Sequence, residues 1–171
     1  MLREHILGKE IFDEAFTEYI NRWAYKHPTP NDFFRTIENG SGEELNWFWR
    51  GWFIHNWKID QAIKSVKYVD GNPKNGVIVK IENLEQMPMP VTLEFTTENG
   101  ALSRYKLPVE IWKRNNKWSF KYDSEEPIKK VVIDPDYVFP DVNSSNNLWT
   151  PEIAIELSLI HISEPTRLSW I

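Results

Sequence analysis

The sequence predicts an α+β fold: a helical segment in residues 1–58, followed by an antiparallel β-sandwich of about six strands in residues 59–149. Two observations lead to this prediction. In the first segment apolar residues recur at steps of three and four, which is the period of a helix with one buried face. In the second segment apolar and polar residues alternate in short runs, separated by turn signals at intervals of roughly ten residues. Residues 150–171 are interpreted as a tail.

Three helices are expected in the first segment, and each has its own start or stop signal. The first ends before Pro28, because the residue preceding a proline disfavours the α region. The second begins with Thr29 as N-cap and Pro30 in the first helical position, and Asn39 with Gly40 ends it. The third begins with a capping-box pattern over 41–44 and carries the aromatic residues that follow. The expected helices span residues 11–27, 29–40 and 41–53.

Six short strands are expected in the second segment. Asn99 with Gly100 is a hairpin signal, and Asn115 with Asn116 marks another turn. Prolines at 88, 90 and 108 are expected at strand ends, edges or bulges, because proline cannot donate to a sheet ladder. The expected strands span residues 63–69, 77–81, 91–96, 102–112, 118–122 and 128–133.

Composition excludes several classes of protein. The 171 residues include 20 Lys and Arg against 25 Asp and Glu, a net charge of −5, and no cysteine. Disulfide scaffolds, thiolate zinc sites and cysteine nucleophiles are therefore excluded. An acidic chain without a basic patch disfavours binding to nucleic acid, and no stretch approaches the ~20 apolar residues of a membrane span.

No catalytic or metal-binding residue is predicted. The histidines His5, His27 and His55 stand in no HExxH pattern, which would place two imidazoles one helical turn apart on one metal ion. A GxSxG nucleophile turn is also missing. Three further acids are interpreted as turn residues around two prolines rather than as a calcium site; they are Asp134, Asp136 and Asp141.

The most unusual local feature is an aromatic block within the third expected helix. We interpret it as a structural junction between the helices and the sandwich, with an aromatic platform for a ligand as the alternative. In this block Arg50 is expected to stack on a ring or to pair with an acid such as Asp60, and Gly51 to let another backbone approach closely. The junction residues are Trp47, Trp49, Arg50, Gly51, Trp52 and Phe53.

The chain resembles the M1-family zinc metallopeptidases, and above all the aminopeptidase-like M1 proteins of Bacteroidetes-type bacteria. The resemblance covers nearly all of residues 1–149. In the helical segment the matching motifs are Leu2-Arg3-Glu4, Leu7-Gly8, Phe12, Phe16, Arg22-Trp23, His27-Pro28-Thr29-Pro30, Asp32-Phe33-Phe34-Arg35 and Trp47-Phe48-Trp49-Arg50-Gly51-Trp52-Phe53. In the second segment they are Asn83-Leu84, Pro88-Met89-Pro90-Val91-Thr92, Leu107-Pro108-Val109-Glu110-Ile111-Trp112, Asp134-Pro135-Asp136 and Phe139-Pro140-Asp141-Val142-Asn143.

This resemblance implies that residues 1–58 are the helical end of a thermolysin-like catalytic domain and residues 59–149 the C-terminal β-sandwich domain. The parent would be a zinc hydrolase that removes N-terminal residues from peptides. Its HExxH motif, glutamate ligand and catalytic tyrosine would lie upstream, so none is carried over to a position here. The expected partner is the missing N-terminal catalytic half, Met1 is expected to be an internal methionine or an assigned start, and this chain alone is expected to be inactive. The sequence gives no localisation, although export of the parent is compatible with it.

The end of the chain has a separate origin in this interpretation. Residues 157–167 read LSLIHISEPTR, which is similar to the translation of a common transposon-based sequencing-library adapter, codon by codon. Residues 157–171 are therefore expected to be an adapter-derived artefact, with the native sequence ending near Glu156.

An alternative function remains open: a stand-alone Trp-rich β-sandwich module that binds carbohydrate or peptide. It predicts exposed, co-planar tryptophan rings, whereas the peptidase interpretation predicts that most of the nine tryptophans are buried. A sandwich that serves only in protein assembly is a third possibility, and it predicts buried tryptophans without an upstream metal motif.

Overall fold

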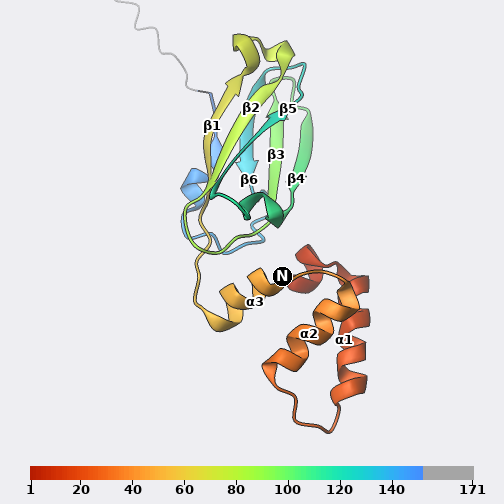
Figure 1. The fold of residues 1–171 in the computed structure, drawn as a ribbon. Helices are drawn as coiled ribbons and strands as arrows, with labels where there is room; N and C mark the ends of the chain where they lie inside the picture. The colour runs from red at the N-terminus through yellow and green to blue at the C-terminus, as the bar shows by residue number, and fades with distance from the viewer. Residues whose placement is uncertain (152–171) are drawn as a thin grey trace, which may run out of the picture.

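The computed structural model describes residues 1–151, which form an α+β structure with helices at one end and two antiparallel sheets at the other (Figure 1). The expected adapter segment 157–171 and most of the predicted tail lie outside the described residues. The helical elements are a π-helical turn Leu2–Ile6, α1 (Lys9–Trp23), α2 (Pro30–Ser41), α3 (Asn46–Trp49) and a second π-helical turn Arg50–Ile54. The strands are β1 (Gln61–Tyr68), β2 (Val77–Asn83), β3 (Val91–Thr97), β4 (Leu102–Leu107), β5 (Lys117–Tyr122), β6 (Ile128–Ile133) and β7 (Leu148–Trp149).

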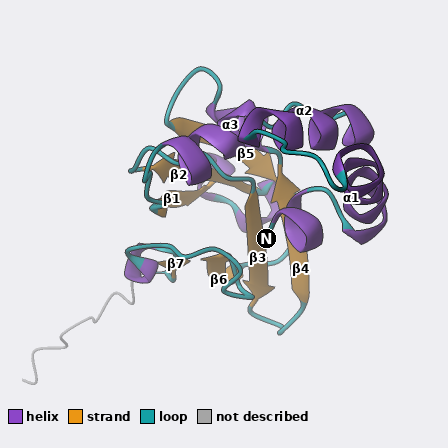
Figure 2. Cartoon of the chain, turned by 90° about the horizontal axis from the view of Figure 1, so that it is seen from below, coloured by secondary structure: helices purple, strands orange, loops and turns teal. Residues whose placement is uncertain are grey.

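The seven strands of the described chain form two sheets. One has the order β1-β2-β5 and the other β4-β3-β6-β7, and every neighbouring pair is antiparallel. Seen from the helical end, the sheets lie as two layers (Figure 2). All six expected strands are present. The seventh, β7, has only two residues and pairs with β6 through Trp149 and Val131, which is too short a run for alternation to reveal.

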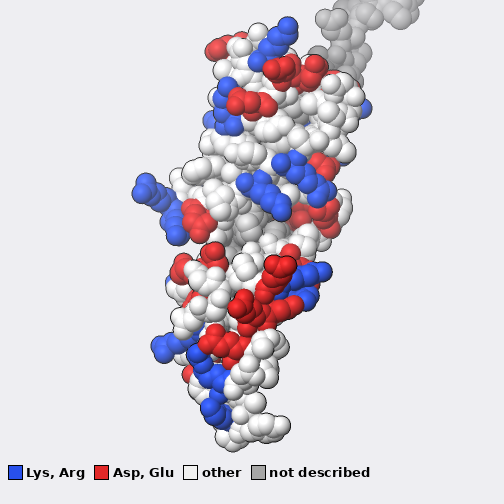
Figure 3. Space-filling view, turned by 90° about the vertical axis from the view of Figure 1, so that its right-hand side faces the viewer, with Lys and Arg blue, Asp and Glu red and all other residues white. Residues whose placement is uncertain are grey.

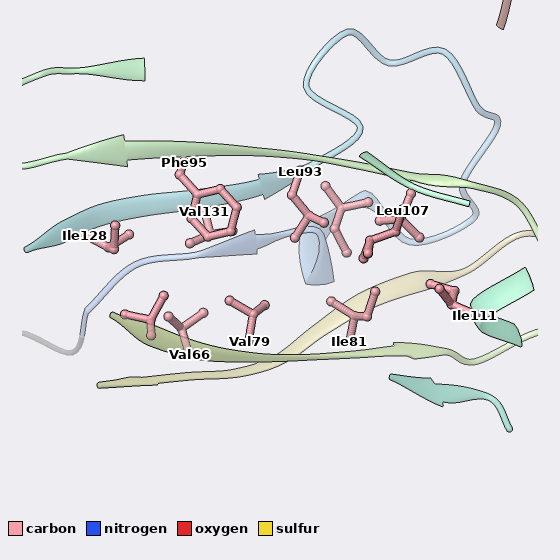
Figure 4. Close-up of a cluster of buried hydrophobic side chains, with 12 residues drawn as sticks. Val66, Val79, Ile81, Leu93, Phe95, Leu107, Ile111, Ile128 and Val131 are labelled. Atoms are coloured by element: carbon pink, nitrogen blue, oxygen red, sulfur yellow. The ribbon is translucent and has the colours of Figure 1, made fainter. Parts of the chain in front are cut away.

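The core between the sheets comes from alternating positions on facing strands. In β2 the residues Val77, Val79 and Ile81 point inward, and Leu93 and Phe95 of β3 meet them from the other sheet (Figure 4). These side chains are almost completely buried. Burying each such side chain stabilises the fold by about 1.5–3 kcal/mol, so this cluster is the main source of sheet stability.

The strand predicted over 102–112 is too long. Strand β4 ends at Leu107, and Pro108 leads into a short 3₁₀ turn at Val109–Trp112. Pro108 has no N–H for the ladder, and the turn carries Ile111 into the sheet core. The predicted hairpin at Asn99 and Gly100 is confirmed, with Gly100 at φ +86° and the Thr97 amide donating to the Ala101 carbonyl.

Helix α1 ends at Trp23, before the predicted stop at His27, because the backbone leaves the helical region at Ala24, where ψ is 134°. The end of α2 also differs from expectation, at two glycines. Helix α2 continues past Gly40 to Ser41, and Gly42 closes it in the left-handed conformation with φ +71°. Gly40 instead lies against α1, because a Cβ built on it would stand 2.7 Å from the Cβ of Ala15. The capping box expected at 41–44 is also absent from the structure, since α3 begins only at Asn46 with Leu45 as its N-cap. The sequence pattern marked Gly40 as the stop of α2 and did not show that close packing on α1 requires this glycine.

Charges on the molecule are mixed in sign. On the face in Figure 3, Lys and Arg side chains are interspersed with Asp and Glu and do not gather into a basic patch. Within residues 1–151, none of the helices combines the length and apolar character needed to cross a membrane.

Candidate functional site

The aromatic block forms one short helical element whose side chains diverge in two directions. Helix α3 passes directly into the π-helical turn Arg50–Ile54, so the block is contiguous. Phe48, Trp49 and Gly51 are buried, whereas Trp47 and Trp52 are half-buried. Arg50, Phe53 and Ile54 are exposed. The predicted junction residues therefore divide between an interior face and a surface face.

The interior face packs on α2. The ring of Trp49 is 3% exposed and stacks on Phe34 with ring centroids 4.5 Å apart. Phe53 meets both rings edge-on. The Trp49 Nε1 donates to Glu38 Oε1 at 3.1 Å, and the same oxygen accepts the Leu45 amide. Each aromatic pair adds about 0.5–1.5 kcal/mol beyond area burial, so this contact anchors the block to the helices.

The contact with the sheets is made at Gly51. A Cβ at this position would stand 2.0 Å from Met87 Sδ, so only glycine allows the approach. Met87 and Met89, in the loop between β2 and β3, are fully buried in the helical cluster. Gln61 Nε2 of β1 donates to the Met89 carbonyl at 3.0 Å and fixes the loop to the sheet. The close approach expected of Gly51 is thus present, although a side chain makes it rather than a backbone.

On the other side of the same block lies a cleft of about 440 Å³. Three indoles from separate parts of the chain line it: Trp47 of α3, Trp57 and Trp112. Each is half-buried, so part of its surface faces the cleft. Small-molecule sites commonly measure about 300–1,000 Å³ and are mostly apolar with a few polar groups. The remaining lining residues are Glu44, Asn46, Arg50, Asn83, Glu85, Gln86, Pro88, Val109, Lys113 and Asn116.

Asn83, at the end of β2, has an unsatisfied polar atom in the cleft wall. Its side chain donates from Nδ2 to the Met87 carbonyl at 3.2 Å, which fixes the orientation of the amide. Its Oδ1 is buried and has no hydrogen-bond partner within residues 1–151, while the residue is only 5% exposed. A buried acceptor without a donor costs about 1–3 kcal/mol. Asn83 therefore contributes a structural contact to the cleft wall, and its Oδ1 is enclosed by the fold.

The charges around the cleft balance. Arg50 and Lys113 oppose Glu44 and Glu85. The Arg50 guanidinium lies over the Trp57 ring, 5.7 Å from its centroid, and His55 stacks on that ring as well. Of the two contacts expected for Arg50, stacking is therefore the one formed.

Asp60, the acid proposed as the other partner of Arg50, has a different partner. Its Oδ1 accepts a hydrogen bond from Asn146 Nδ2 at 2.7 Å. The three histidines lie on separate segments: the first π-helical turn, the loop after α1, and the end of the second π-helical turn. In the part of the chain that the structure describes, no three His, Asp or Glu side chains are grouped to hold a metal ion.

The acids considered for calcium binding make structural contacts. Asp134 accepts the amides of Val138 and Phe139, closing the turn after β6. Asp141 accepts the amide of Gln61 and so ties β1 to a distant loop. Asp136 forms a two-bond pair with Arg104, and hydrogen bonds from this guanidinium lower the pKa of the Asp136 carboxyl below its ordinary value.

Sequence reasoning missed most of the cleft, since only Trp47 and Arg50 of its lining belong to the predicted junction residues. Trp57, Asn83, Trp112 and Asn116 were not singled out as binding residues, because nothing in their local sequence relates them to α3. The described tryptophans also fit neither expectation fully. Only Trp49 is buried and only Trp118 is exposed, while the other six described tryptophans are half-buried. No two indoles of the described chain stack on each other.

Comparison with known proteins gives no assignment: no family model matches the chain, and no curated protein matches it. The M1 resemblance therefore rests on sequence motifs alone and stays a prediction.

Proposed function

We propose that this chain is the non-catalytic C-terminal portion of an M1-type zinc metallopeptidase and supports the catalytic domain from behind. The parent would hydrolyse N-terminal residues from peptides. The residues present here do not fit a zinc site, because they contain no HExxH motif and no suitable group of ligands among the described positions. The chemistry is accordingly assigned to the catalytic half, and this chain's role is to hold that half in place.

The observation that carries the proposal is the uncovered apolar surface of α1. At 100° per residue its apolar stripe is about 180° wide. Helix α2 covers part of this stripe at Ala15, which is 1% exposed and lies against Gly40. The two edges remain uncovered, with Ile11 45% and Ile20 47% exposed. A helix that packs against two neighbouring elements has an apolar stripe of this width. The width of the stripe on α1 therefore supports a second packing partner at its exposed edges.

A second feature supports a positioning role. Trp49 anchors the aromatic block to α2, and Gly51 anchors it to the buried Met87. Through this block the helices are fixed to the sheets, while the apolar edges of α1 stay uncovered. Supporting a catalytic domain requires a rigid attachment of this kind, because small displacements of the reacting groups reduce the reaction rate.

Dye binding tests the uncovered surface. The full chain is expected to bind the hydrophobic dye ANS, and Ile11→Ser with Ile20→Ser is expected to lower the fluorescence by at least about half. The matched control is Leu102→Ser, which removes an exposed leucine of β4 and should change the signal little. Equal effects of both variants, or no dye binding, would argue against a dedicated docking face.

The assignment to an M1-type peptidase is tested by sequencing the source DNA and by an activity assay. The reading frame is expected to continue upstream of Met1 through an HExxH motif and a following glutamate. The purified chain, given zinc and aminoacyl p-nitroanilides, should show no turnover, whereas the longer polypeptide should hydrolyse them. Turnover by the chain alone, or an upstream frame without the motif, would refute the proposal.

A further inference from the structure

We propose that the cleft beside α3 is a binding site for a neutral saccharide, held between the indoles of Trp47, Trp57 and Trp112 with its hydroxyls bonded to the exposed carboxamides of Asn46, Gln86 and Asn116. The inference does not depend on the peptidase assignment, because every residue that it uses lies within the described chain. Three properties of the cleft carry it: its aromatic walls, its carboxamide groups and its balanced charge.

The aromatic walls suit the apolar face of a sugar ring. A pyranose presents C–H bonds on one face, and their weakly positive hydrogens complement the negative face of an indole. Each of the three indoles has a contact within the chain that fixes its position. Trp112 Nε1 donates to the Met89 carbonyl at 2.8 Å, Trp47 packs edge-on against Phe48, and the Trp57 ring contacts Arg50 and His55. The aromatic surfaces are thus preorganised, which lowers the entropy cost of binding.

The polar groups suit hydroxyls. Four carboxamide side chains line the cleft, from Asn46, Asn83, Gln86 and Asn116. Each carboxamide offers both a donor and an acceptor, as each hydroxyl does. Three of them, Asn46, Gln86 and Asn116, are exposed and can therefore reach a ligand, whereas Asn83 is buried and its Nδ2 bond to the Met87 carbonyl holds the 83–87 turn in place.

The charge balance favours a neutral ligand over an ionic one. Two cations, Arg50 and Lys113, face two acids, Glu44 and Glu85, so the cleft as a whole selects neither sign. A peptide is the competing ligand. Extended peptides usually add to an open strand edge through main-chain hydrogen bonds, whereas these walls come from α3 and the segment after it to Trp57, the end of β2 with the loop that follows, and the 109–116 segment.

The first experiment titrates the isotope-labelled, full 171-residue chain and follows the indole N–H signals by NMR. The probes are cellotetraose, xylotetraose, mannotetraose, maltotetraose and chitotetraose, with tetraalanine as the peptide probe. Single Trp→Phe variants assign the signals. We expect at least one saccharide to shift Trp47, Trp57 and Trp112 with a Kd below about 1 mM, while Trp118 and Trp149 stay in place.

A matched pair of variants locates the site. Asn116→Ala removes a cleft carboxamide, whereas Asn115→Ala removes its exposed neighbour that does not line the cleft. We expect Asn116→Ala to weaken binding at least about fivefold and Asn115→Ala to change it less than twofold. Gln86→Ala, which removes a second exposed carboxamide of the cleft, is also expected to weaken binding at least about fivefold, with the indole signals outside the cleft unchanged.

Three results would overturn the proposal. They are no saccharide-induced shift at any concentration up to the solubility limit, shifts confined to tryptophans outside the cleft, or binding of tetraalanine alone. Equal effects of the two asparagine variants would overturn it as well. Both asparagines are exposed, so neither substitution removes a buried side chain and the comparison does not depend on a change in folding.

Discussion

At Gly51 the absence of one carbon atom determines how the two ends of the molecule meet. Its backbone φ is not positive, so the glycine is required for space and not for conformation. Met87 fills that space and is itself completely buried. Well-packed interiors tolerate extra volume poorly, because neighbours have no free position to move into.

We expect Gly51→Ala to lower the free energy of unfolding by about 1–3 kcal/mol, because the new Cβ overlaps Met87 Sδ. Met87→Ala alone should cost about 2–5 kcal/mol through the cavity that it leaves. In the double variant the alanine methyl enters that cavity, so the two costs should be less than additive by at least about 1 kcal/mol. Urea unfolding of all four proteins measures this coupling, and simple additivity would show that Gly51 and Met87 do not compete for the same space.

At the scale of an element, α2 shows how local sequence bounds a helix. Pro30 occupies its first position, and the Asp32 carboxylate accepts hydrogen bonds from the Thr29 amide at 2.8 Å and the Thr29 hydroxyl at 2.7 Å. These bonds lower the pKa of the Asp32 carboxyl, the hydroxyl bond being the larger cause. The charge also lies at the positive end of the helix dipole.

Asp32→Asn tests the cap through pH. A carboxyl whose pKa is lower in the folded state stabilises the fold at pH values above its unfolded pKa, and this contribution disappears as pH falls through the folded pKa. We expect the variant to have a lower Tm than the wild type near about pH 7, and the difference to shrink steadily towards about pH 2. Glu14→Gln, which removes an exposed carboxyl on α1, is the control. A difference that does not change with pH would show that the Asp32 charge is not involved.

At the scale of the whole molecule, two hydrophobic clusters lie one at each end. The sheet cluster contains the inward residues of both sheets, and the helical cluster contains Ala15, Phe34, Trp49 and the methionines of the 83–90 loop. The helices reach the sandwich through loop residues such as Ile59 and Met87, not by lying across a sheet face (Figure 1). Regions with fewer buried contacts open more readily, so the two ends need not unfold together.

Hydrogen exchange tests this division. We expect amides of α1 and α2 to exchange faster than those of β3 and β6, which lie in the centre of their sheet. Trp49→Leu should accelerate exchange in α1 and α2 at least about tenfold and leave β3 and β6 within about twofold, because it removes the stacking on Phe34 and the bond to Glu38. Equal acceleration at both ends would show that the described chain unfolds as one cooperative unit.

The local sequence was sufficient to predict most elements of the described chain. Helix α1 follows from the spacing of its apolar residues, α2 from the start signal at Thr29 and Pro30, and the six longer strands from alternation. These features depend on residues that are close together in the sequence, so they can be recognised without the tertiary structure. The exceptions were also local: α1 ends at Trp23 instead of His27, Gly42 rather than Gly40 closes α2, α3 begins only at Asn46, and β4 ends early at Pro108.

Only the tertiary structure determined what these elements form together. Trp47, Asn83 and Trp112 are far apart in sequence, and no periodicity relates them, yet they line one cleft. Whether Asn83 Oδ1 has a donor, or Gly40 and Gly51 have space for a methyl group, depends on atoms from distant segments. Sequence by itself determined the elements, because propensity and periodicity are short-range. The junction and the cleft arise from packing between segments, and packing depends on three-dimensional contacts.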